Sequence, residues 1–102
     1  MTRVFVVDDS AFARRATTRV LVNDPGLQVV GEAANGAEAL ARIPAVRPDV
    51  VTLDLDMPGM NGLVVLKALL ARDPALRVIM LSAHTKEGAE ATLEALEAGA
   101  AD

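Results

Sequence analysis

Three aspartates at the ends of two hydrophobic runs are the residues of this chain best suited to chemistry. Asp54 directly follows the run Val50–Leu53, and Asp8 and Asp9 directly follow the run Val4–Val7. Continuous apolar runs are typical of strands that are buried on both faces of a parallel sheet. If the two strands are neighbours, the three carboxylates meet at the carboxyl edge of the sheet, where open α/β folds bind their ligands. Carboxylate oxygens are hard ligands that suit Mg²⁺, and a carboxylate can itself attack phosphorus.

Acidic residues at strand ends can also be ordinary solvated turn or capping residues. Three of them beside two core strands favour a functional site, because crowded like charges repel and a divalent cation removes that cost. The Pro- and Gly-rich loop that follows could aim a backbone carbonyl at the metal. Ser82 ends another apolar run, and its hydroxyl could bind an oxygen on a modified Asp54. The only histidine, His84, is interpreted as a loop residue, and no GxGxxG or Walker motif indicates a nucleotide site.

Strand-like and helix-like segments alternate along the chain. The apolar runs predict strands over residues 4–7, 27–33, 50–53 and 78–81. Capping and turn residues predict helices from the Ser10 cap to Asn23, from the Asn35 cap to Ile43, from about Leu63 to Asp73, and from about Glu87 to Ala98. Alternation of this kind predicts an α/β fold, in which right-handed crossovers place helices on both faces of a parallel sheet.

The helical spacing also predicts which side chains face the core. In the first helix the apolar stripe is assigned to Phe12, Ala16 and Val20, with the arginines mostly away from it. In the third helix it is assigned to Leu63, Leu66 and Leu70.

Composition narrows the class of protein. The 102 residues are enough for one domain, and 52% of them are hydrophobic, which allows a sizeable core. The net charge of −4 with scattered basic residues argues against a nucleic-acid partner. There is no cysteine for disulfide or thiolate chemistry, no apolar run long enough for a membrane span, and no recognisable signal peptide. We therefore expect a protein of the cytoplasm.

The ordered motifs resemble the receiver domain of two-component response regulators. They are the segments 6–10 (VVDDS), 53–62 (LDLDMPGMNG) and 81–83 (LSA). The resemblance implies a flavodoxin-like, doubly wound parallel sheet of strand order 2-1-3-4-5. It also implies that Asp54 accepts a phosphoryl group from a histidine kinase and that Asp9, Asp54 and the Asp56 carbonyl bind Mg²⁺. Asp8 would act mainly through water, and Ser82 would be the hydroxyl that senses the phosphoryl oxygens.

Two longer segments, residues 9–15 and 82–96, are similar to the receiver of chemotaxis protein-glutamate methylesterases of the CheB type. In that family the receiver regulates a C-terminal hydrolase that demethylates receptor glutamyl esters and deamidates glutamines. The resemblance implies a chemotaxis histidine kinase as partner. This chain alone would be the regulatory domain, whereas the parent protein would be the methylesterase.

The pattern supplies four strand–helix units and stops where a fifth strand is expected. We therefore expect residues 1–102 to be a receiver domain that is incomplete before strand five and the last helix. An uncovered edge at residues 78–81 would then favour a homodimer or a higher oligomer.

Two alternative functions are considered. One is a stand-alone receiver or one from a transcription factor. The other is a phosphotransferase of the haloacid-dehalogenase type, which also places a second acid two residues after a nucleophilic aspartate, as Asp54 and Asp56 do.

Overall fold

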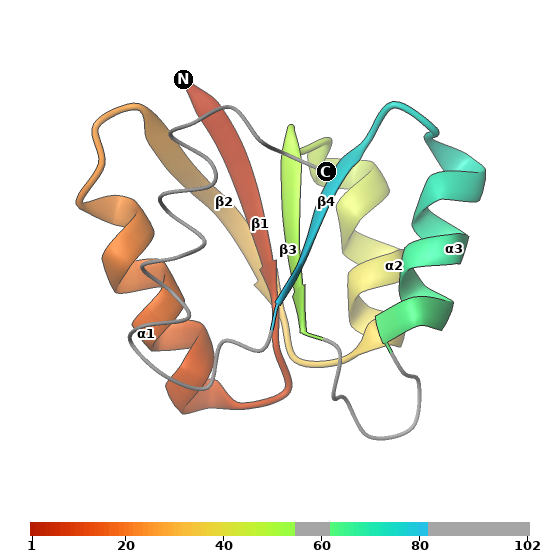
Figure 1. The fold of residues 1–102 in the computed structure, drawn as a ribbon, viewed down its shortest axis with the longest axis horizontal. Helices are drawn as coiled ribbons and strands as arrows, with labels where there is room; N and C mark the ends of the chain where they lie inside the picture. The colour runs from red at the N-terminus through yellow and green to blue at the C-terminus, as the bar shows by residue number, and fades with distance from the viewer. Residues whose placement is uncertain (55–61, 82–102) are drawn as a thin grey trace.

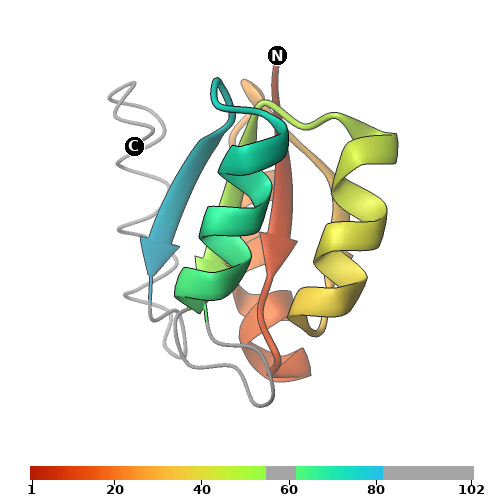
Figure 2. The same cartoon turned by 90° about the vertical axis from the view of Figure 1, so that its right-hand side faces the viewer.

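A four-stranded parallel sheet carries helices on both of its faces in the computed structural model, which describes residues 1–54 and 62–81 (Figure 1). The elements in chain order are β1 (Thr2–Val7), α1 (Ala11–Val22), β2 (Leu27–Ala33), α2 (Gly36–Val46), β3 (Val50–Asp54), α3 (Gly62–Arg72) and β4 (Arg77–Leu81). Helix α1 covers one face, while α2 and α3 lie side by side on the other (Figures 1 and 2). The helix expected over residues 87–98 lies outside the described residues.

The strands are ordered β2-β1-β3-β4, which confirms the predicted flavodoxin-like order for the strands that the structure describes. Strand β1 pairs in parallel with both β2 and β3, and Val7 lies opposite Leu53. Strand β3 pairs with β4, so that Asp54 lies opposite Leu81. The strand order therefore reverses between β1 and β3, and the carboxyl ends of these two strands form the switch point where such sheets bind ligands.

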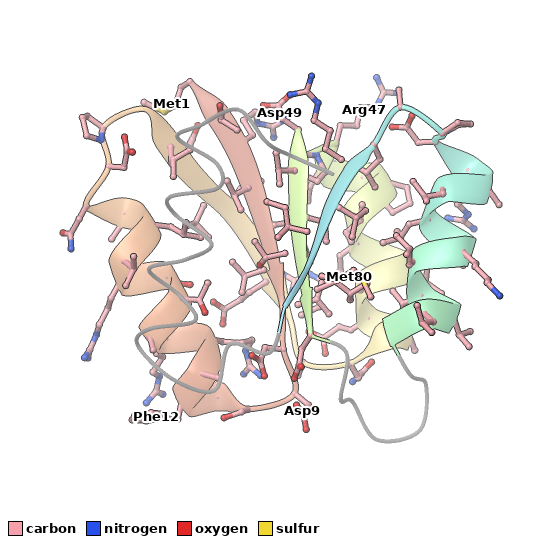
Figure 3. All side chains as sticks on the ribbon, in the orientation of Figure 1. Met1, Asp9, Phe12, Arg47, Asp49 and Met80 are labelled. Atoms are coloured by element: carbon pink, nitrogen blue, oxygen red, sulfur yellow. The ribbon has the colours of Figure 1, made fainter. Side chains whose placement is uncertain are left out.

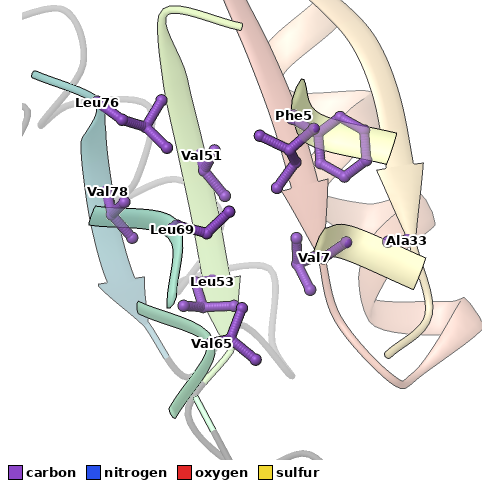
Figure 4. Close-up of a cluster of buried hydrophobic side chains, with 11 residues drawn as sticks. Phe5, Val7, Ala33, Val51, Leu53, Val65, Leu69, Leu76 and Val78 are labelled. Atoms are coloured by element: carbon purple, nitrogen blue, oxygen red, sulfur yellow. The ribbon is translucent and has the colours of Figure 1, made fainter. Parts of the chain in front are cut away.

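Alternate side chains of β1 enter two separate hydrophobic clusters. Val4 and Val6 pack with Leu21 on the α1 face, whereas Phe5 and Val7 enter the larger cluster beneath α2 and α3 (Figure 4). The last four side chains of β1, from Val4 to Val7, are almost completely buried. This burial on both faces explains why the central strands are continuous apolar runs rather than alternating sequences.

The orientation of α1 differs from the predicted one by one residue. The Ser10 hydroxyl caps the helix as expected, accepting from the Ala13 N–H at 3.1 Å. The buried positions, however, are Ala13, Thr17 and Leu21, and Phe12 is 76% exposed. The predicted stripe was wrong because the buried face includes a threonine, which an apolar pattern does not count.

The predicted stripe of α3 was correct only in part. Leu66 and Leu70 pack at the edge of the core, but Leu63 is exposed and the buried apolar positions are Val65 and Leu69.

Helix α2 continues beyond the predicted end at Ile43 and contains Pro44. Proline has no N–H to donate to the carbonyl four residues earlier, which here belongs to Leu40. The Arg72 guanidinium of α3 lies 3.5 Å from that carbonyl oxygen and donates to it instead. The helix then ends at Arg47, which adopts the left-handed conformation with φ of 54°. The carbonyl that Pro44 cannot serve thus has a donor from a neighbouring helix.

None of the helices within the described part of the chain is long and apolar enough to cross a membrane.

Candidate phosphoacceptor and metal site

The three predicted aspartates meet at the carboxyl edge of the sheet. One carboxylate oxygen from each of Asp8, Asp9 and Asp54 lies within 4.8 Å of the others. Asp54 is the last residue of β3 and is completely buried, and Asp8, the first residue after β1, is 2% exposed. Asp9 is exposed and points away from the end of β1 (Figure 3). The site therefore has two buried carboxylates and a third that faces solvent.

The backbone around Asp8 is held from both sides. Its N–H donates to the Ala33 carbonyl at 3.1 Å, which extends the β1–β2 pairing by one residue. Its carboxylate oxygen Oδ1 accepts from the Ser10 N–H at 2.9 Å, and its carbonyl accepts from Arg14 Nη1 at 2.8 Å. Strand pairing, a helix cap and an arginine thus fix the turn that carries the acidic residues.

The structure brings together part of the predicted site. Asp8, Asp9 and Asp54 form one cluster, as predicted from the two strand ends. Asp56, Ser82 and His84 lie outside the described residues. Sequence reasoning missed Arg14, which was assigned to the polar side of its helix but has a side chain only 16% exposed. The sequence position of Arg14 could have indicated this contact. Arg14 lies one helical turn after the Ser10 cap, so its side chain is on the same side of the helix as the cap and the end of β1.

Three carboxylates at this spacing can hold a hard divalent cation, since all the donors are oxygens and two of them are already removed from bulk water. A carboxylate can also act as a nucleophile toward phosphorus. The geometry therefore suits metal-assisted phosphoryl chemistry better than acid–base catalysis by a lone carboxylate.

Comparison with known proteins assigns the class. The sequence profile of the response regulator receiver domain matches residues 4–102, so the chain belongs to that family. This confirms the predicted family and decides against the haloacid-dehalogenase alternative.

Proteins of similar sequence indicate which kind of receiver domain this chain resembles. The chain is 57% identical, over 98% of its length, to a protein-glutamate methylesterase/protein-glutamine glutaminase of Moorella thermoacetica. It is 54% identical, over the same share, to the corresponding protein of Pyrococcus abyssi. The chain spans only about a quarter of these relatives, 23% and 27% of their lengths.

Solved structures agree with both results. The response regulator domain of Thermotoga maritima CheB superposes with a TM-score of 0.77 at 44% identity, covering 100% of this chain and 75% of that one. A Borrelia burgdorferi CheX–CheY–BeF3–Mg²⁺ complex matches with a TM-score of 0.75 at 34% identity, covering 96% and 72%. The chain is therefore a receiver domain closely related to those of CheB proteins, as the sequence motifs predicted.

Proposed function

We propose that this receiver domain takes a phosphoryl group from a histidine kinase onto Asp54, and that Mg²⁺ bound by the acidic cluster assists the transfer. The observation that carries the proposal is the convergence of Asp8, Asp9 and Asp54 within 4.8 Å at the switch point of the sheet. A cluster that served only to cap turns would have no reason to place two of its carboxylates almost completely out of solvent.

Asp54 is the member best placed to be the acceptor. It ends the central strand β3, which is paired on both sides, so its backbone is held rigidly. In the proposed reaction an Asp54 oxygen forms a bond to phosphorus as the P–N bond to the donor imidazole breaks. The electron pair of that bond stays on the imidazole nitrogen, and the product is an acyl phosphate.

The metal would be held by Asp9 and Asp54, with Asp8 acting mainly through water. A bound divalent cation supplies positive charge that offsets the acidic cluster and the phosphoryl oxygens. The family resemblance adds the Asp56 carbonyl as a ligand and the Ser82 hydroxyl as the group that senses the phosphoryl oxygens. The related Borrelia complex contains Mg²⁺ and BeF3 by its title, which supports this choice of metal.

Removing a metal ligand is expected to abolish stabilisation by Mg²⁺. A ligand that binds only the folded state raises the free energy of unfolding by about 2.7 kcal/mol when its concentration is 100 times its Kd. Thermal unfolding with and without excess Mg²⁺ should show this gain in the wild type and not in Asp9→Ala. Asp24→Ala, which changes an aspartate far from the cluster, is the control and should keep the gain. Equal midpoints in the wild type with and without Mg²⁺ would contradict the metal assignment.

The output that we propose is regulation of a methylesterase/glutaminase in a cytoplasmic chemotaxis pathway, in a protein organised like the curated relatives. Sequence identity supports this choice, because it is 44% to the CheB receiver and 34% to the matching chain of the Borrelia complex. A stand-alone or transcription-factor receiver is the alternative. Nothing in the acidic cluster itself distinguishes these outputs, since it would serve the same phosphoryl chemistry in each.

The direct test is phosphorylation by a small phosphodonor such as acetyl phosphate. With Mg²⁺ we expect one phosphoryl group per chain, seen as an added mass and located by peptide mapping to the segment containing Asp54. Chelation of the metal should stop the incorporation. A phosphoryl group found on any other residue would refute the assignment of Asp54.

A further inference from the structure

The Arg14 side chain links the acidic turn to the edge strand of the sheet. Its Nη1 donates to the main-chain carbonyl of Asp8 at 2.8 Å, and its Nε lies 3.5 Å from Glu32 Oε1 on β2. The side chain is 16% exposed, whereas Arg15, the next residue along the helix, is exposed. Arg14 is therefore part of the site's surroundings rather than of the solvated helix face.

Glu32 orients the guanidinium. It lies on β2 opposite Val6 of β1, one residue before the strand end, and its own carbonyl accepts from Arg42 at 2.6 Å. The Glu32 carboxylate is 47% exposed, so the ion pair contributes little free energy by itself. The ion pair instead orients the side chain, because a guanidinium held by one acceptor presents its remaining N–H groups in a fixed plane.

The Asp8 carbonyl belongs to the planar peptide that joins Asp8 to Asp9. Holding this carbonyl fixes the plane of the peptide, so that rotation about the N–Cα bond of Asp9 is the backbone freedom that remains in the direction of the Asp9 side chain. The Ser10 N–H holds the same turn from its other end, by donating to Asp8 Oδ1 at 2.9 Å. The two contacts together oppose the tendency of three crowded carboxylates to move apart.

We propose that Arg14 is a positioning residue for the metal site, which acts through the Asp8 carbonyl to hold the Asp8–Asp9 turn in its metal-binding geometry. This inference rests on the proposed function, because it assumes that the cluster binds Mg²⁺. Arg14 touches neither the metal nor the phosphoryl group in this role.

The direction in which the Mg²⁺ affinity changes when Arg14 is replaced separates a positioning role from a purely electrostatic one. A positive charge beside the cluster disfavours a cation, so removing the charge alone would tighten Mg²⁺ binding. Removing the contact with the Asp8 carbonyl loosens the turn and weakens binding instead. Partners that orient metal ligands in this way are typically worth about 10- to 100-fold in affinity.

The experiment is a calorimetric Mg²⁺ titration of the wild type, Arg14→Met, Arg14→Lys and the control Arg15→Met. Methionine retains most of the apolar stem and removes the donors. We expect Arg14→Met to bind Mg²⁺ about 10-fold more weakly. Arg14→Lys, which can still donate to the carbonyl, should recover most of the affinity, and Arg15→Met should match the wild type. Unchanged or tighter binding by Arg14→Met overturns the proposal.

Amide hydrogen exchange in metal-free protein gives an independent readout. Exchange of the Ser10 N–H reports whether the turn is held, so Arg14→Met should exchange this hydrogen about 10-fold faster than Arg15→Met does. Equal rates overturn the positioning role. If the wild type binds no Mg²⁺, the metal assignment of the proposed function fails, and the exchange result still decides whether Arg14 holds the turn.

Discussion

Replacing Asp54 by asparagine is expected to abolish phosphoryl transfer to the chain. Asparagine keeps the shape of the side chain but lacks the anionic oxygen that forms the bond to phosphorus. Mass spectrometry after treatment with acetyl phosphate and Mg²⁺ should therefore find no added phosphoryl group in Asp54→Asn. The matched control is Asp49→Asn. Asp49 directly precedes β3, at the end of that strand opposite to Asp54, and its carboxylate accepts from the Arg3 N–H at 2.8 Å. This control should be phosphorylated as the wild type is.

The same substitution should stabilise the metal-free protein. Two unit charges about 5 Å apart repel by on the order of 3 kcal/mol at an effective dielectric constant of about 20. Because Asp54 lies within 4.8 Å of two other carboxylates, neutralising it should raise the free energy of unfolding without Mg²⁺ by about 1–3 kcal/mol. Urea unfolding followed by circular dichroism measures this, since the chain has no tryptophan or tyrosine for fluorescence. Loss of phosphorylation together with lower metal-free stability would point to misfolding rather than to the loss of the acceptor.

The acidic cluster was predictable because two independent sequence rules place it. Apolar runs identify β1 and β3 as buried parallel strands, and the carboxyl ends of such strands meet at one edge. The residues that directly follow or end those runs are Asp8, Asp9 and Asp54, so their proximity requires no knowledge of side-chain packing. The helix caps at Ser10 and Asn35 were predictable for a different reason, because each cap depends on residues only three positions apart.

The features that were not predictable depend on contacts between distant elements. Pro44 lies inside α2, and the carbonyl that it cannot serve accepts from Arg72, which is 28 positions away in the sequence. The rotation of α1 was misassigned because the buried stripe contains Thr17, whereas the stripe that begins at Phe12 is wholly apolar, and only docking on the sheet chooses between them. Arg14 was missed because its partner Glu32 is on β2, and a helical pattern describes only the helix.

Replacing Gly31 by alanine is expected to destabilise the fold markedly. A Cβ atom at this position would lie 2.7 Å from Cε2 and 3.0 Å from Cδ2 of the Phe5 ring, closer than carbon atoms pack. The ring cannot move aside easily, because Phe5 is completely buried in the larger core cluster. Gly31 also lies opposite Phe5 at the point where the β1–β2 register shifts, which leaves the backbone little freedom to adjust. Overpacking of this kind typically costs about 1–3 kcal/mol.

A double-mutant cycle identifies the Phe5 ring as the cause of that loss. Gly31→Ala in the Phe5→Leu background should cost less than it does in the wild type, with a coupling free energy of about 0.5–3 kcal/mol. The matched control is Gly26→Ala, whose Cβ would meet only the Asp24 carboxylate at 3.2 Å and should cost less than about 1 kcal/mol. Urea unfolding of the five proteins measures every term. An additive cycle would mean that the loss at Gly31 comes from its own backbone and not from contact with Phe5, so the close approach of β2 to the aromatic ring would not be what requires glycine there.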